Sequence, residues 1–298
     1  MPPRALRAGQ RAELHVIDVV TGEDRLVHES SSLLFEAPNW SPDGRWLVVN
    51  GGGRLFRLPA DGGELEEVPL GDVPEINNDH VLSPDGATVY VSAEDGHLYA
   101  VPFEGGGAPR RVSNDRGAFR HYLHGISPDG ATLAYIGLVQ HADGTATTNV
   151  WTIPAAGGLD VQLTDDEFPD DGAEFSPDGR WVLFNSERAR TEPGHAQLFR
   201  MRTDGSSVEQ LTFDERVNWF PHVSPDGSRL AYISFPRGTL GHPADLDVVL
   251  RLLEPYDADG APGTVRDLVV LFGGQGTINV PSWASDSRRL AYVAYPMS

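Results

Sequence analysis

One tetrapeptide recurs along the chain and divides it into six similar units. Ser-Pro-Asp-Gly begins at residues 41, 83, 127, 176 and 224, and an altered copy, Ala-Ser-Asp-Ser, begins at residue 284. The copies lie 42 to 60 residues apart, and a strand-like run such as RWLVVN or SRLAYIS follows each one. A period in the forties with several short strands per unit is typical of the blades of a β-propeller.

The tetrapeptide has the residues that a type I turn requires. Ser suits the first position, Pro presets φ at the second, and Gly accepts the positive φ at the exit. Each turn therefore joins two strands. A third strand, a Gly-rich hairpin and a more polar fourth strand complete the unit, as in residues 149–164. This pattern predicts four antiparallel strands per blade, called a to d from the axis outwards.

The two ends of the chain carry complementary halves of one blade. The last repeat stops after its second strand, near residues 290–295, whereas residues 13–19 and 25–28 form a strand, a turn and a strand. Pairing these halves would remove two open sheet edges. We predict one all-β domain, 1–298: a six-bladed β-propeller with four-stranded antiparallel blades, the last closed by strands from both termini. The predicted blades are about 36–71, 77–113, 121–164, 171–212, 218–272, and 279–298 plus 12–30.

Composition excludes several classes of function. The 298 residues include no cysteine and no long apolar run, which excludes disulfides, thiol catalysis and a transmembrane helix. All 23 basic residues are arginine, so lysine chemistry is also excluded. The net charge of −20 argues against a nucleic-acid partner. The N-terminal residues lack the apolar region of a secretory signal, so we expect a cytoplasmic protein without membrane association.

The repeats resemble those of a known family. Six such units, with LFEAPNWSPDG (34–44), NWFPHVSPDG (218–227) and LFGGQGTINVPSW (271–283), resemble the PD40 (WD40-like) repeats of TolB-like propellers, in particular those of small uncharacterised bacterial proteins. The resemblance covers essentially the whole chain. It implies the six-bladed fold, but a fold of this kind hosts many functions.

Candidate binding residues precede the repeats. In a propeller, the residues before each strand-a turn, together with the d-to-a and b-to-c loops, build one mouth of the central channel. This register predicts a binding site for a small polar ligand, such as a sugar or uronate. The predicted ligand-binding residues are Asn39, Asn78, Asp79, His80, His124, Asp171, Trp219 and Asn279. For Trp219, together with Phe220, the alternatives are a stacking platform for a sugar ring and ordinary core packing.

Histidines on the same face have two interpretations. A long b-to-c excursion in blade 5, PRGTLGHPADLD, adds His242 to the mouth. The histidines either line a polar pocket or bind a divalent metal such as Mn, Zn, Fe or Ni, with His222, His242 and Gln275 as the predicted ligands.

Two classes of function stay open. The propeller and the candidate His/Gln site resemble oligogalacturonate lyase, which implies metal-assisted β-elimination on a uronate. Unlike that family, this chain has no His shortly after Gln275. The first class is therefore a small-ligand binder, including a metal-dependent carbohydrate lyase or hydrolase. The second is a non-enzymatic scaffold with a protein partner.

Overall fold

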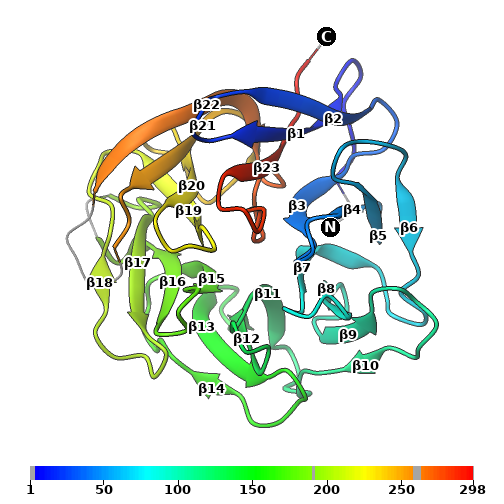
Figure 1. Ribbon diagram of the computed structural model, residues 1–298. Helices are drawn as coiled ribbons and strands as arrows, with labels where there is room; N and C mark the ends of the chain where they lie inside the picture. The colour runs from blue at the N-terminus through cyan, green and yellow to red at the C-terminus, as the bar shows by residue number, and fades with distance from the viewer. Residues whose placement is uncertain (1–3, 190–191, 258–262, 298) are drawn as a thin grey trace.

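Six antiparallel β-sheets form a closed ring around a central axis (Figure 1). The computed structural model describes residues 4–189, 192–257 and 263–297. Within these residues, five sheets have four strands each, and the sixth has three. The predicted six-bladed all-β propeller is confirmed.

Each of the first five blades contains four strands that follow one another in the sequence. Blade 1 contains β3 (Glu36–Trp40), β4 (Trp46–Gly51), β5 (Arg54–Pro59) and β6 (Glu66–Val68). Blade 2 contains β7 (Ile76–Leu82), β8 (Thr88–Ala93), β9 (Leu98–Pro102) and β10 (Arg110–Arg111). Blade 3 contains β11 (Arg120–Ile126), β12 (Thr132–Gln140), β13 (Ala146–Pro154) and β14 (Val161–Gln162). Blade 4 contains β15 (Asp170–Phe175), β16 (Trp181–Ser186), β17 (Gln197–Arg202) and β18 (Glu209–Gln210). Blade 5 contains β19 (Val217–Val223), β20 (Leu230–Phe235), β21 (Ala244–Glu254) and β22 (Thr264–Gly274).

Blade 6 joins the two ends of the chain, as predicted. Its sheet has the order β2 (Asp24–Ser30), β1 (Ala12–Asp18), β23 (Arg289–Ala294). The pair β1–β23 is antiparallel, with Leu14 opposite Val293. The predicted innermost strand of this blade is reduced to one bridge between Trp283 and Leu290. The ring is therefore closed by hydrogen bonds between residues more than 270 positions apart in the sequence.

Helices contribute almost nothing to this architecture. The helical element in the described part of the chain is one 3-10 turn, Glu187–Ala189. The described residues contain no helical segment with the length and hydrophobicity of a transmembrane span.

The repeated tetrapeptide forms the same turn in each blade. In blade 1, Ser41 Oγ donates to Asp43 Oδ1 (2.6 Å) and accepts a hydrogen bond from the Trp46 amide (2.9 Å). The hydrogen bond from Ser41 and that from the Arg45 amide lower the pKa of Asp43 to about 2. In the altered sixth copy, Ser287 adopts the positive φ (58°) that Gly44 (73°) adopts in the first. The repeat is therefore a turn between strands a and b that is held in place by hydrogen bonds of its own serine and aspartate side chains.

Each of the five regular innermost strands is irregular just before its turn. Their register against the second strand shifts within the residues that precede the repeat serine. In three blades the residue four positions before that serine has a positive φ: 54° at Ala37, 66° at Gly172 and 55° at Phe220. A bulge of this kind re-aims the side chains beside it. The candidate binding residues on the inner strands lie in or beside these bent stretches, whereas His242, Gln275 and Asn279 lie in connections between strands.

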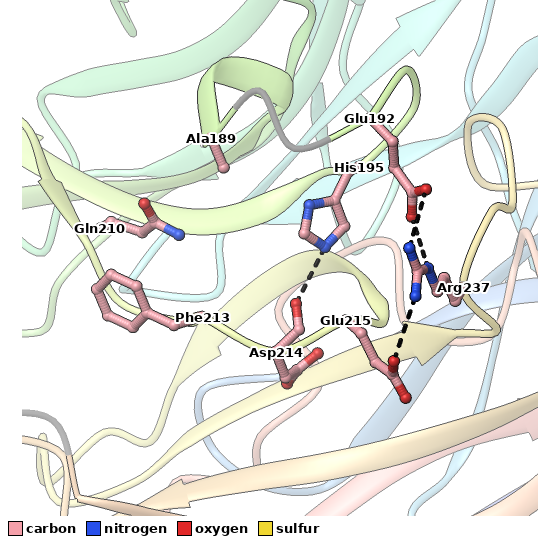
Figure 2. A pocket seen from close by; sticks show the side chains of 8 residues that line it. All are labelled: Ala189, Glu192, His195, Gln210, Phe213, Asp214, Glu215 and Arg237. Carbon is pink, nitrogen blue, oxygen red and sulfur yellow. Dashed lines mark hydrogen bonds and ion pairs between the residues drawn. The ribbon is translucent and has the colours of Figure 1, made fainter.

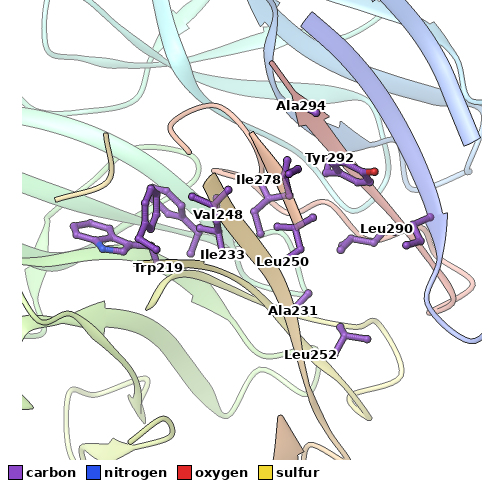
Figure 3. Packing of buried hydrophobic residues seen from close by; sticks show 14 of the residues in the cluster. Trp219, Ala231, Ile233, Val248, Leu250, Leu252, Ile278, Leu290, Tyr292 and Ala294 are labelled. Atoms are coloured by element: carbon purple, nitrogen blue, oxygen red, sulfur yellow. The ribbon is translucent and has the colours of Figure 1, made fainter. Parts of the chain in front are cut away.

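Apolar side chains fill the space between neighbouring blades. Figure 3 shows the cluster between blades 5 and 6, in which Trp219, Ile233 and Leu250 of blade 5 belong to the same buried group as Leu290 and Tyr292 of blade 6. Five further buried clusters have the same character. Burial of apolar surface therefore joins the blades into one ring, and it supplies a rigid frame for polar residues at the axis.

Candidate functional site

Two histidines from different blades converge on the carboxylate of Asp171. His124 lies on β11 in blade 3, Asp171 lies on β15 in blade 4, and His242 lies on the connection between β20 and β21 in blade 5. The Nε2 atom of His124 is 2.8 Å from Asp171 Oδ1, and the Nε2 atom of His242 is 3.4 Å from Asp171 Oδ2. Three consecutive blades thus meet at one carboxylate.

Gln275 and Asn279 complete a closed network with these three residues. The Nδ1–H of His242 donates to Gln275 Oε1, which also accepts a hydrogen bond from Asn279 Nδ2 (3.1 Å). The backbone carbonyl of Asn279 in turn lies 3.2 Å from His124 Nδ1. We call His124, Asp171, His242, Gln275 and Asn279 the axial cluster. All five were predicted to lie at the same mouth, and the structure brings them into mutual contact.

The axial cluster holds a pair of opposite charges. Burial opposes a charge on His124, but the adjacent Asp171 carboxylate prevails and raises the pKa of His124 to about 9. Both ring nitrogens of His124 face oxygen acceptors, which suits the imidazolium form. Burial alone would raise the pKa of Asp171, yet His124 and His242 hold it well below its usual range. At neutral pH the cluster therefore contains a largely buried imidazolium–carboxylate pair.

Asp79 adds a second buried carboxyl beside this pair. Burial, assisted by repulsion from Asp171, raises the pKa of Asp79 to about 6, although the positive charge of His124 opposes the shift. The Asp79 Oδ2 atom accepts a hydrogen bond from Asn77 Nδ2 (2.8 Å). The charge of Asp79, next to the axial cluster, therefore changes as the pH passes through about 6.

Three other predicted binding residues do not join the axial cluster. Asn39 Nδ2 donates to the carbonyl of Pro281 (2.6 Å), and His80 Nε2 lies 3.4 Å from the carbonyl of Val48. These side chains connect neighbouring parts of the ring, and burial lowers the pKa of His80 to about 4. Asn78 is buried, and its Nδ2 atom has no hydrogen-bond partner in the described structure. A ligand role for these three residues stays a prediction.

The predicted metal ligands are not assembled around one point. His222 lies 2.5 Å from Glu174 Oε2 through Nδ1 and 2.5 Å from the Ile278 carbonyl through Nε2, so protein oxygen atoms already occupy the positions in front of both ring nitrogens. His242 and Gln275 instead bond to each other. Among the described residues, no group of three or more His, Cys, Asp or Glu side chains is arranged to hold a metal ion. The set of His222, His242 and Gln275 does not fit a Mn, Zn, Fe or Ni site.

The two aromatic residues before the blade 5 repeat are packed rather than displayed. Trp219 is 5% exposed and Phe220 is 1% exposed. The Trp219 ring lies 4.5 Å from the His242 ring, and Phe220 lies between His242 (5.1 Å) and His124 (5.8 Å). The stacking-platform interpretation is wrong because these rings have no free face for a sugar. They support the imidazoles of the axial cluster.

A separate cavity lies between blades 4 and 5 (Figure 2). It has a volume of about 410 Å³ and is lined by Ala189, Glu192, His195, Gln210, Phe213, Asp214, Glu215 and Arg237. Arg237 pairs with Glu192 (3.0 Å) and Glu215 (3.6 Å), so most of its charge is neutralised within the cavity. Phe213 is 73% exposed. The sequence pattern did not single out this cavity, because most of its residues come from connections between strands.

Residues near the N-terminus also lie beside the axial cluster, and sequence reasoning missed them. Arg4 donates to Glu36 Oε1 (2.9 Å) and to the backbone carbonyl of Gln275 (2.7 Å). It also pairs with Asp245 (3.1 Å). No repeat or motif surrounds Arg4, so no sequence signal could have connected it with the mouth of the propeller.

Comparison with known proteins agrees with this architecture. Residues 124–248 match the family described as the TolB beta propeller domain, PD40. An uncharacterized protein of Agrobacterium fabrum is 40% identical over 290 residues, which cover 96% of this chain and 92% of that protein. A solved structure from Agrobacterium tumefaciens with a provisional TolB designation is 39% identical, with a TM-score of 0.86, covering 97% of this chain and 99% of that one.

A more distant likeness concerns the fold alone. The structure of an oligogalacturonate lyase in complex with manganese has a TM-score of 0.54 at 14% identity, covering 86% of this chain and 67% of that one. At this identity the likeness reports the propeller and not its chemistry. The 40% identity to the Agrobacterium fabrum relative, which extends over nearly the full length of both chains, and the PD40 match establish that the chain belongs to the family of TolB-like β-propellers.

Proposed function

We propose that the axial cluster binds a small polar ligand of the sugar or uronate class. One observation carries the proposal. Asp171 joins two imidazoles in a largely buried network, yet the side chains of Asp171 and His242 remain 21% and 29% exposed. Burying this many polar groups is costly, and a carboxylate with a shifted pKa that still reaches solvent is typical of a binding site.

The chemistry of the cluster favours hydroxyl groups. The carboxylate of Asp171 accepts hydrogen bonds, His242 can donate or accept, and Gln275 adds a partly exposed amide. A sugar hydroxyl both donates and accepts, so one ring could engage several of these groups at once. The proposal is limited to binding, because the predicted metal ligands do not fit a metal and no step of β-elimination is supported by the contacts of His222.

A protein-interaction scaffold is the second candidate. The cavity between blades 4 and 5, with the exposed ring of Phe213 at its rim, is the observation that favours it. We place it second because Arg237, Glu192 and Glu215 already satisfy one another there. A pure scaffold would bind no sugar, so the experiment below separates the two functions.

His242→Ala is expected to weaken sugar binding by about tenfold or more, because it removes a polar group that reaches both the ligand and Asp171. Isothermal titration with methyl galactoside and galacturonate gives the Kd. His141→Ala is the matched control, since His141 is exposed on the β12–β13 connection and bonds to Thr147 (3.1 Å). The control is expected to keep the wild-type Kd. Absence of sugar binding by the wild type, or equal losses in both variants, would reject the proposal.

Uronate binding is expected to tighten as the pH falls through about 6. Asp79 has a pKa of about 6, so below that pH it loses the negative charge that repels a uronate carboxylate. Methyl galactoside has no carboxylate, and its Kd should change little over the same range. The measurement is a titration with both sugars at several pH values. Asp79→Asn should bind galacturonate equally well at all of them, and a pH dependence that persists in this variant would assign it to another group.

A further inference from the structure

The side chain of Arg4 fills a pocket of complementary shape and charge. Its guanidinium donates to Glu36 Oε1 (2.9 Å), Asp245 Oδ1 (3.1 Å) and the Gln275 carbonyl (2.7 Å). The Cζ atom also lies 4.1 Å from the centre of the Tyr295 ring. Two carboxylates, one carbonyl and an aromatic face together form a recognition site for a planar guanidinium.

This pocket is buried and tightly built. The side chains of Arg4, Glu36 and Asp245 are 19%, 12% and 9% exposed. Gly276 closes one wall with φ +88°, and a Cβ there would lie 2.5 Å from Tyr295 Oη and 2.6 Å from Glu36 Oε1. Burial raises the pKa of Glu36 even beside Arg4, so this carboxylate would be costly to bury without a cation.

The pocket is connected to the axial cluster through two short routes. The carbonyl of Gln275 accepts from Arg4, while its side chain holds His242 and Asn279. Asp245 lies three residues after His242 and has a positive φ of 62°, which is unfavourable for a residue with a Cβ. The contacts that hold Asp245 and Gln275 in place therefore also set the position of the His242 imidazole.

The rest of the N-terminal segment binds the same carboxylate. Arg7 pairs with Asp245 Oδ2 (2.9 Å), and Gln10 Nε2 donates to Asp245 Oδ1 (2.6 Å) and to the Tyr295 carbonyl (3.2 Å). Arg7 and Gln10 are also joined to each other by two hydrogen bonds. Residues 4–10 thus form a strap whose polar contacts centre on Asp245, at the start of β21 in blade 5, and extend to Glu36, Gln275 and Tyr295.

We propose that Glu36, Asp245, the Gln275 carbonyl and Tyr295 form a guanidinium-binding pocket, filled by Arg4, whose occupancy positions His242 within the axial cluster. Arg4 is a positioning residue and does not touch the bound ligand. Its consequence for sugar affinity rests on the proposed function, whereas its effect on the His242 loop does not. Withdrawal of the strap would leave two carboxylates facing each other and would release this loop.

Hydrogen–deuterium exchange of the full chain tests the pocket without any sugar. In Arg4→Ala, exchange in residues 236–247 and 271–280 is expected to become about tenfold faster, because charge-assisted hydrogen bonds no longer hold these loops. Exchange in blade 2, residues 88–102, should stay unchanged. Arg11→Ala is the matched control, since Arg11 pairs with Glu13 (3.1 Å) and not with the blade 5 loop. This control should exchange like the wild type.

Chemical rescue distinguishes a guanidinium pocket from a general effect of the N-terminus. Methylguanidine should restore slow exchange in Arg4→Ala, whereas methylammonium, which lacks the planar fork, should restore much less. Asp245→Asn should exchange as fast as Arg4→Ala and should not respond to methylguanidine. Wild-type exchange in Arg4→Ala, or failure of methylguanidine to slow it, would overturn the proposal.

A conservative variant keeps the test decisive if Arg4→Ala does not fold. Arg4→Lys retains the charge but loses the bidentate geometry, and it should also speed exchange around His242, by a smaller factor. Unchanged exchange in Arg4→Lys, combined with loss of folding throughout Arg4→Ala, would show a purely structural role and reject the proposal. If exchange changes as expected but no variant or wild type binds sugar, the pocket stands and the proposed function fails.

Discussion

Replacing Asp171 with Asn is expected to lower the free energy of unfolding by about 3 kcal/mol at pH 6, because it leaves the His124 imidazolium buried without its counter-charge. The variant keeps the shape of the side chain, so the loss reports the charge and not a cavity. In the same variant the pKa of His124 should fall well below about 9, since Asp171 is the main group that opposes the effect of burial, and only Asp79 and the Asn279 carbonyl would still oppose it.

The pH dependence of stability has a definite sign. His124 has a folded pKa of about 9, above its unfolded value of 6.5, so its contribution is complete below pH 6.5 and is lost as the pH rises through 9. Asp171 has a lowered pKa, so its contribution is present above 3.8 and is lost as the pH falls below that value. The contribution of the pair is therefore largest between pH 3.8 and 6.5.

Urea unfolding across this range and an NMR titration of the histidine rings provide the measurements. Asp247→Asn is the matched control, because Asp247 is an exposed carboxylate on β21 and should change the unfolding free energy by less than about 0.5 kcal/mol. If His124 still titrated near pH 9 in Asp171→Asn, another group would have to supply the stabilising charge.

Deletion of residues 281–298 is expected to abolish cooperative unfolding altogether. The deletion removes β23, which pairs with β1 along its whole length, and it removes the bridge at Trp283. Leu290 and Val293 are completely buried, so their neighbours in blades 1 and 5 would be exposed to water. Thermal unfolding followed by circular dichroism measures the effect, and a truncated chain with the wild-type transition would show that the ring does not depend on this closure.

A point substitution provides a graded version of the same test. Tyr292→Ala is expected to cost about 3 kcal/mol or more, because it leaves a cavity in the cluster between blades 5 and 6. It also removes the hydrogen bond from Tyr292 Oη to Asp24 Oδ2 (2.6 Å). Val20→Ala, in the exposed turn between β1 and β2, is the control and should cost less than about 0.5 kcal/mol.

Histidines at equivalent positions of the repeat make different contacts in the ring. His80 and His124 both lie three residues before the repeat serine, and the sequence pattern treats them alike. In the structure His124 contacts Asp171 of the next blade, whereas His80 lies against the Val48 carbonyl of the preceding one. The residue of the next blade that corresponds to Asp171 is Tyr122, which supplies no carboxylate to His80. Neighbouring blades, and not the register within one blade, thus decide which histidine becomes charged.

The sequence alone was sufficient to predict the fold because the conformation of each repeat follows from the residues within it. The Ser-Pro-Asp-Gly turn is determined by its own residues: serine locks the aspartate and the next strand, and glycine adopts a positive φ. Six such turns, each joining two apolar strands, favour a ring of six blades. The half-blades at the two ends of the chain cover their open sheet edges only by pairing with each other. The face that carries His124, Asp171, His242, Gln275 and Asn279 follows from the same register.

Only the tertiary structure decided which of these side chains interact. The partners of His222 are Glu174 of blade 4 and the Ile278 carbonyl before blade 6, and this placement removes it from the predicted metal site. Bulges in the inner strands turn Trp219 and Phe220 into the core, where an alternating pattern could equally have exposed them. Arg4 reaches Asp245 and Gln275 across more than 240 residues of sequence. Hydrogen bonds between blades depend on the closed ring, and a local sequence pattern contains no information on distances that only closure creates.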